Sequence, residues 1–203
     1  HTRAWPRRCT EAGMGRVAFA LLAWCQLALA IAAGSTGTGY GDLDVAVDHR
    51  DGRYVASLRM VVSARPATAL AVLTDFDHMA DFVPNVTSSR IVARNGNVLR
   101  VAQEGRAEFG PFSWRFASER QVEVFPDGRV LSRALSGSSL SMQSELRLHP
   151  AGTGGTLIEY RIVSVPDFWV PASVGTAFMQ HEMEEQFAAI AREMARRERG
   201  SGH

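Results

Sequence analysis

The run His181-Glu182-Met183-Glu184-Glu185 has the helical spacing at which two histidines and a glutamate form the site of a zinc protease. Glu185 stands where the second histidine belongs, so the run lacks one of the two imidazoles that would bind the metal. We therefore interpret these residues as the solvated face of a helix. No metal site is predicted here.

A second group, Asp75, Asp77, His78 and Asp81, offers carboxylate oxygens of the kind that bind a hard cation. Helix capping explains these residues more simply, with Asp77 as the N-cap of a short helix. The serines of 137–141 (Gly-Ser-Ser-Leu-Ser) lack the second glycine of a nucleophile elbow. We assign no catalytic residue, no metal and no cofactor from these motifs.

Alternating side chains predict a mostly apolar pocket that contains a few polar groups. In the strand expected from Phe112, one face carries apolar residues together with Ser118 and Arg120, while the other face is charged. Such a lining suits a hydrophobic ligand with one or two polar oxygens. The alternative is that Arg120 lies near a strand end or pairs with a carboxylate at the rim. The predicted ligand contacts are Gln103, Trp114, Phe116, Ser118, Arg120, Tyr160, Trp169, Met183 and Phe187.

A long C-terminal helix, expected over 171–199, organises the elements that would position these side chains. Its apolar residues recur at helical spacings of three and four, and Pro171 suits a first turn. A helix with one wide apolar face needs a sheet to pack against. We expect the sheet to wrap around this helix and to leave a cavity lined by Trp114, Phe116, Ile158 and Phe187; simple core packing without a cavity is the alternative.

Strands occupy most of the chain before that helix. A hairpin is expected at Asp51-Gly52, between strands over 43–47 and 54–62. Two short helices follow, over 67–74 and 77–82. Six further strands, separated by turn residues, are predicted over 86–94, 98–109, 112–125, 130–135, 140–149 and 156–165.

The N-terminal residues indicate export. We interpret 1–13 as an upstream extension, 14–33 as a signal peptide cleaved near Ala32, and 34–41 as a glycine-rich linker before a domain over 42–199. A membrane anchor over 17–33 is the alternative. The predicted mature chain has no cysteine, and its 18 arginines and 20 acidic residues give a net charge of −2. That balance argues against nucleic-acid binding. We expect a monomeric periplasmic or secreted protein.

The order of these elements resembles the START-like superfamily, also called the Bet v 1-like or helix-grip fold. The resemblance lies in 63–84, in Gly155-Thr156-Leu157-Ile158-Glu159-Tyr160 and in the terminal helix, and covers roughly 54–197. These stretches are similar to the polyketide cyclase/dehydrase and coenzyme-Q-binding branch. The resemblance implies an α+β fold in which a curved antiparallel sheet wraps around a long C-terminal helix, with two short helices after an early strand.

The leading hypothesis is a domain that buries a quinone- or lipid-like molecule between sheet and helix. The alternative is a polyketide cyclase or dehydratase, for which Tyr160, Arg120 and His78 are the only candidate acid–base groups. A third hypothesis is an interaction domain with a filled core. Trp169 either lies at the cavity mouth, where it would contact a membrane or the entering ligand, or packs as a plug under the start of the helix.

Overall fold

The computed structural model describes residues 40–109, 112–152, 154–167 and 170–201, without the side chains of Phe109, Phe112 and Trp114. The predicted extension, the signal peptide and most of the predicted linker lie outside these residues. The helices are α1 (Pro66–Leu73), α2 (Met79–Phe82) and α3 (Ala172–Gly200), and a 3-10 turn spans Phe76–His78. The strands are β1 (Tyr40–Arg50), β2 (Arg53–Val62), β3 (Val86–Asn95), β4 (Val98–Phe109), β5 (Phe112–Val124), β6 (Val130–Gly137), β7 (Ser139–Ala151) and β8 (Gly155–Pro166).

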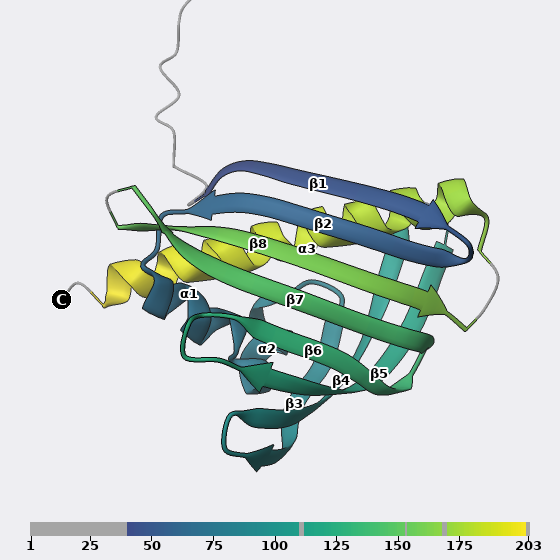
Figure 1. Ribbon diagram of the computed structural model, residues 1–203, viewed down its shortest axis with the longest axis horizontal. Coiled ribbons are helices and arrows are strands. Elements are labelled where there is room, and N and C mark those ends of the chain that lie inside the picture. Colours follow the sequence, from purple (N-terminus) through teal and green to yellow (C-terminus); the bar gives the residue numbers. More distant parts are fainter. Residues whose placement is uncertain (1–39, 110–111, 153, 168–169, 202–203) are drawn as a thin grey trace, which may run out of the picture. The chain divides into compact units, whose positions relative to one another are not determined.

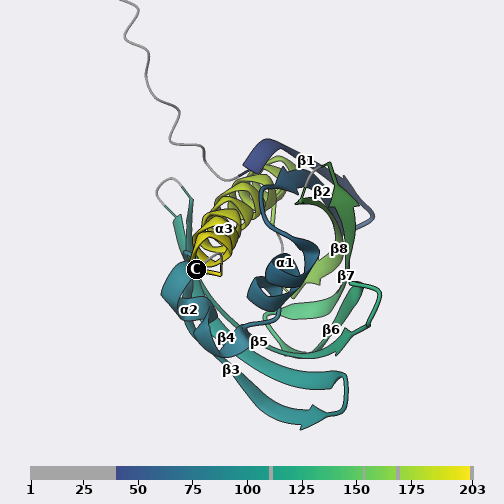
Figure 2. The same ribbon diagram turned by 90° about the vertical axis from the view of Figure 1, so that its left-hand side faces the viewer.

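The described strands form one antiparallel sheet in the order β1-β2-β8-β7-β6-β5-β4-β3. The sheet curves so that α1 and α3 lie on its concave side (Figures 1 and 2). This is the predicted α+β helix-grip arrangement, and the predicted strands agree with the observed ones to within a few residues. β1 is longer than predicted, because it begins at Tyr40 within the segment 34–41 that was interpreted as a linker.

The first hairpin turns where the sequence predicts it. Asp51 and Gly52 both have positive φ angles, 50° and 73°, as a two-residue type I′ turn requires. The prediction that Asp77 caps a helix is wrong: its Oδ1 accepts a hydrogen bond of 2.7 Å from the backbone N–H of Ile91. The short helical segment is therefore joined to β3 by a side chain instead of being capped by it.

The hydrophobic core occupies one end of the concave side. There the C-terminal half of α3 packs with α1 on β2 and β8, and Met60, Ile158 and Met194 are fully buried. Thr156 donates a buried hydrogen bond of 2.6 Å to the carbonyl of Ala64, which ties β8 to the segment before α1. Because this end is filled, the open space lies under the N-terminal half of α3.

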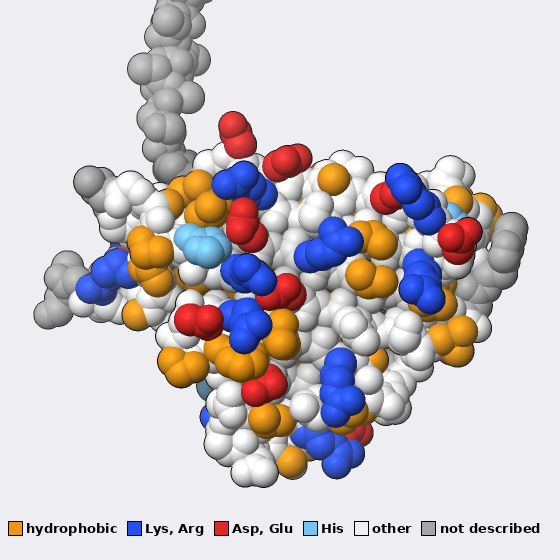
Figure 3. Space-filling view, in the orientation of Figure 1, with side chains coloured by type: hydrophobic (Ala, Val, Ile, Leu, Met, Phe, Trp, Pro, Cys, Tyr) orange, Lys and Arg blue, Asp and Glu red, His pale blue; other side chains and the backbone are white. Residues whose placement is uncertain are grey.

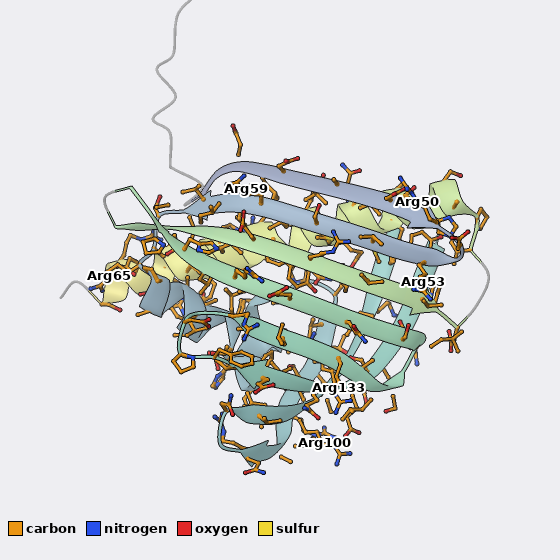
Figure 4. The ribbon with its side chains drawn as sticks, in the orientation of Figure 1. Arg50, Arg53, Arg59, Arg65, Arg100 and Arg133 are labelled. Atoms are coloured by element: carbon orange, nitrogen blue, oxygen red, sulfur yellow. The ribbon has the colours of Figure 1, made fainter. Side chains whose placement is uncertain are left out.

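The convex outer face of the sheet carries arginines and acidic residues side by side (Figure 3). Several of its arginines have acidic partners, including Arg50 with Asp48 at 2.8 Å and Arg59 with Glu159 at 3.6 Å (Figure 4). Arg133 instead donates to Gln121 at 2.9 Å. These exposed pairs contribute little to stability. The arginines named here are thus each bonded to a neighbouring side chain on the outer face.

Candidate ligand-binding cavity

A cavity of about 460 Å³ lies between the concave side of the sheet and the N-terminal half of α3. Apolar side chains of α3 form its roof, and those of α1, α2 and the 3-10 turn close one end. The roof consists of Val174, Phe178, Met179, Met183, Phe187 and Ile190, and the end of Leu73, Phe76, Met79 and Val83. A space of this size, mostly apolar with a few polar groups, is typical of small-molecule sites.

Most of the predicted ligand contacts lie in this cavity. The lining includes Gln103, Phe116, Ser118, Arg120, Tyr160, Met183 and Phe187. The side chain of Trp114 and the whole of Trp169 lie outside the described residues. Ile158, predicted in the cavity wall, is instead fully buried in the core beside it and does not line the cavity. Strand alternation correctly predicted that Ile158 lies on the inner face of the sheet. It could not predict whether that part of the inner face is covered by the helix or borders the cavity.

Arg120 is the principal charged group of the sheet wall. Its Nη2 donates to Gln103 Oε1 at 2.5 Å, and the guanidinium lies 5.6 Å from the ring centre of Phe76. Its Nε is buried without a hydrogen-bond partner, and among the described residues no carboxylate is within ion-pair distance. The predicted alternative, an ion pair at the rim, is therefore wrong. Burial lowers the pKa of Arg120, because the charged form loses its hydration.

Gln103 holds the guanidinium in place. Its Nε2 donates to Ser89 Oγ at 3.0 Å, so its carbonyl oxygen faces Arg120. Gln103 and Ser89 are both buried, which makes this a continuous polar chain from β3 through β4 to β5. Arg120 thus lines the cavity with one hydrogen bond to Gln103 and without a carboxylate partner among the described residues.

Tyr160 lies on the same wall, in β8. Burial raises the pKa of its hydroxyl, while a hydrogen bond with Ser144 and the positive charge of Arg120 lower it. Its ring centre lies 5.1 Å from that of Phe187 in the roof, with the planes tilted by 44°. Tyr160 thus presents an uncharged hydroxyl to the cavity next to a cation. His78, the third predicted acid–base candidate, is exposed and bonded to Asp75 at 2.6 Å, outside the cavity.

Glu182 is the functional candidate that sequence reasoning missed. The prediction placed 181–185 on a solvated helix face, but Glu182 is only 8% exposed and lines the cavity. Asn85 Nδ2 lies 3.1 Å from its Oε1, and Gln186 Nε2 lies 3.1 Å from its Oε2. Burial raises the pKa of Glu182, and these two hydrogen bonds lower it. The sequence did contain a signal for this burial: Glu182 lies beside Met183 of the apolar stripe and one turn before Gln186.

Two local features bring Asn85 to this carboxyl. Asn85 has a positive φ of 68°, in the left-handed region that asparagine tolerates better than most residues. Its carbonyl oxygen passes over Gly105, where a Cβ atom would lie only 2.0 Å away. Phe116 also packs against Gly105, at 2.3 Å from that hypothetical Cβ. Gly105 therefore leaves the space that both the loop and the cavity wall require.

Serine hydroxyls form a second feature that the sequence analysis underestimated. They come from β5, β6, β7, β8 and the turn between β6 and β7: Ser118, Ser132, Ser136, Ser138, Ser139, Ser144 and Ser164. Ser144 shares the alternation of Met142 and Leu146, which also line the cavity. Ser132 Oγ is buried without a hydrogen-bond partner among the described residues. The sheet wall is therefore more polar than the roof.

The part of the chain that the structure describes contains no group of three or more histidine, cysteine and acidic side chains that could hold a metal ion. Asp75 bonds to His78 and Arg197, and Asp77 to the backbone of β3, so the cluster around 75–81 is used in packing. Within the same described part, no helix has the length and apolar character needed to cross a membrane.

The fold and this cavity define a helix-grip protein with a ligand-sized internal space. Residues 55–195 match the family described as polyketide cyclase/dehydrase and lipid transport. The chain belongs to that family, which confirms the START-like resemblance. No match was found among curated proteins.

Three solved structures illustrate the likeness in fold. A START superfamily protein from Mycobacterium smegmatis is 14% identical, with a TM-score of 0.60 over 72% of this chain and 98% of that one. The Zhui aromatase/cyclase from a Streptomyces species is 12% identical, with a TM-score of 0.61 over 74% and 96%. A STAR-related lipid transfer protein from Xanthomonas axonopodis is 14% identical, with a TM-score of 0.54 over 77% and 98%.

Proposed function

We propose that this protein binds a hydrophobic small molecule or lipid, of quinone- or fatty-acid-like size, whose polar oxygen group pairs with Arg120. The observation that carries the proposal is the buried guanidinium without a carboxylate partner among the described residues, at the wall of a largely apolar cavity. Removing a cation from water costs several kcal/mol unless a partner compensates, about as much as one ion pair can return. A ligand oxygen, best a carboxylate, is such a partner.

The apolar roof supplies the remaining binding energy. Covering the ligand's hydrocarbon removes it from water at about 25 cal/mol per Å² of buried area. Met183 and Phe187 provide surface for this contact without competing hydrogen bonds. The serines on the opposite wall offer hydroxyls to further oxygen atoms of the ligand. A family that includes lipid transport in its description is consistent with such a role.

Binding of cis-parinaric acid, a naturally fluorescent fatty acid, tests the proposal, with its methyl ester as the uncharged reference. Arg120→Gln should weaken binding of the acid about tenfold or more, because a hydrogen bond to a charged group contributes ~1.5–3 kcal/mol. Binding of the ester should change much less. Arg133→Gln, on the outer face, is the matched control. Failure of the wild-type protein to bind either probe saturably would overturn the proposal.

A cyclase or dehydratase acting in the same cavity is the second candidate, and Glu182 favours it. Burial raises the pKa of this carboxyl, so it holds a proton more readily than an exposed glutamate and can act as a general acid or base. Arg120 and Tyr160 would then hydrogen-bond the substrate's oxygens. Conversion of a poly-β-ketone substrate, followed by mass spectrometry, separates the two functions: Glu182→Gln should abolish turnover and keep parinaric acid binding. If the wild-type protein converts none of the substrate, the enzymatic candidate is excluded and binding remains the proposed function.

We also propose that the domain is exported as a monomer after cleavage near Ala32. The support is the order of charge, apolar run and small residues in 14–33. N-terminal sequencing of the protein from the cell envelope tests the cleavage, and a mature N-terminus at or before Met14 would contradict it.

A further inference from the structure

The two strands β6 and β7 separate from each other at one end of the cavity. Their ladder runs from Val130↔Leu146 to Arg133↔Gln143 and stops there. Beyond it, β6 continues along β5 as far as Gly137, while β7 begins at Ser139 along β8. The backbones of 134–138 and 139–142 are therefore not paired with each other, and the chain itself joins them at the far end. We call this unpaired stretch the slot.

Two β-bulges frame this slot. In β6, Arg120 pairs with Ala134 and Glu119 with Ser136, so Leu135 is the extra residue. In β7, Ser139 pairs with Pro166 and Ser141 with Val165, so Leu140 is the extra residue. A bulge bends its strand and leaves the extra residue unpaired. Because the two bulges lie on facing strands, each can bend its strand away from the other.

The slot communicates with the cavity. Its two edges contribute cavity-lining residues from both strands: Ala134, Ser136, Ser138, Ser139 and Met142. The exposed Ser136 lines the cavity as well, which places it at the transition from solvent to interior. Because β6 and β7 are not paired at this point, entry of a ligand here would break no hydrogen bonds between these two strands.

The bulged residues are both exposed leucines. Among the described residues, four large hydrophobic side chains are exposed: Val61 at 45%, Val92 at 43%, Leu135 at 44% and Leu140 at 74%. Two of these four lie on this single hairpin, on the two edges of the slot. Arg115, exposed on β5 and also lining the cavity, lies two residues from Ala117, whose backbone is hydrogen-bonded to Ser138. An apolar rim with a nearby cation suits the surface of an anionic lipid bilayer.

We propose that the slot between β6 and β7 is the entrance of the cavity, and that Leu135 and Leu140 on its rim contact the lipid bilayer from which the ligand is taken. The entrance rests on the proposed binding function; the bilayer contact stands on the rim itself. A hydrophobic ligand then passes from the acyl region to the cavity without crossing bulk water.

The bilayer contact is tested by transfer of cis-parinaric acid from vesicles of phosphatidylcholine with a minority of phosphatidylglycerol. Leu135→Asp and Leu140→Asp should each slow the transfer about tenfold, because each replaces an apolar contact with the acyl region by a charged side chain. Their affinity for the acid in vesicle-free solution should stay unchanged. Val61→Asp and Val92→Asp, of matched exposure, are the controls. Equal transfer rates in all four variants would overturn the contact while leaving the binding function in place.

A direct measurement of bilayer contact does not depend on any bound ligand. In Leu140→Trp, vesicles that contain brominated acyl chains should quench the added indole fluorescence, measured relative to the unsubstituted protein. Val92→Trp should show no such quenching. Quenching that is equal for the two variants, or absent from both, would contradict the proposed contact even if parinaric acid did not bind at all.

The position of the entrance is tested separately in vesicle-free solution. Ser136→Phe narrows the slot and should slow both the association and the dissociation of parinaric acid, whereas the loss of a hydroxyl contact alone would speed dissociation. Ser141→Phe, on the same hairpin but not lining the cavity, is the matched control. Unchanged rates in Ser136→Phe would place the entrance elsewhere.

Discussion

The guanidinium of Arg120 is held by Gln103 through a hydrogen bond of 2.5 Å, and among the described residues it has no carboxylate partner. Gln103→Leu should lower the free energy of unfolding by about 1–3 kcal/mol, because the buried cation loses its principal acceptor. Adding Arg120→Met should recover much of this loss, since a buried cation replaced by an apolar side chain of similar length no longer needs an acceptor. Urea unfolding of the two single variants and the double variant measures the coupling. Strictly additive losses would show that the two side chains do not interact.

Glu182 should make stability depend on pH. Burial raises its folded-state pKa above the ordinary 4.5, so the folded protein binds the proton more tightly than the unfolded chain. Its contribution is therefore fully present below pH 4.5 and is lost as pH rises through the folded pKa. Glu182→Gln should match the wild type at low pH and exceed it in unfolding free energy above the folded pKa. A constant difference across that range would contradict the assignment.

Glu193 should show the opposite dependence. Its hydrogen bond with Arg196, with a smaller contribution from Arg197, lowers its pKa from 4.5 to about 2 against the effect of burial. A lowered folded-state pKa gives stability that is present above 4.5 and is lost as pH falls toward 2. Glu193→Gln should therefore be less stable than the wild type at neutral pH, with the difference shrinking in acid. Thermal unfolding over this range measures it, with the exposed Glu108→Gln as control.

Tyr54 and Gly175 form a close contact between β2 and the first turns of α3. The Tyr54 hydroxyl is buried without a hydrogen-bond partner among the described residues, and a Cβ at position 175 would lie 2.1 Å from it. Tyr54→Phe should raise the free energy of unfolding by about 1 kcal/mol, because an unsatisfied hydroxyl costs ~1–3 kcal/mol. Gly175→Ala should destabilise the protein. Tyr54→Phe should also relieve part of the loss caused by Gly175→Ala; no relief would mean that the ring, not the hydroxyl, limits the space.

The strands and the long helix follow from local patterns that the sequence contains. Alternation placed Gln103, Phe116 and Arg120 on the inner face because a strand turns successive side chains to opposite sides. Asp51-Gly52 specified its turn through two positive φ angles. These are short-range rules, so the sequence was enough to apply them. The fold class followed from the order of the elements together with its resemblance to the START-like superfamily.

Tertiary structure alone decided which inward-facing residues meet open space. Ile158 and Tyr160 share one face of β8, yet the first lies in the filled core and the second in the cavity. The difference comes from where α3 packs closely and where it does not. The burial of Glu182 likewise depends on Asn85, almost one hundred residues earlier in the chain. Such contacts depend on how distant segments approach each other, and the periodicity of any one segment contains no information about that distance.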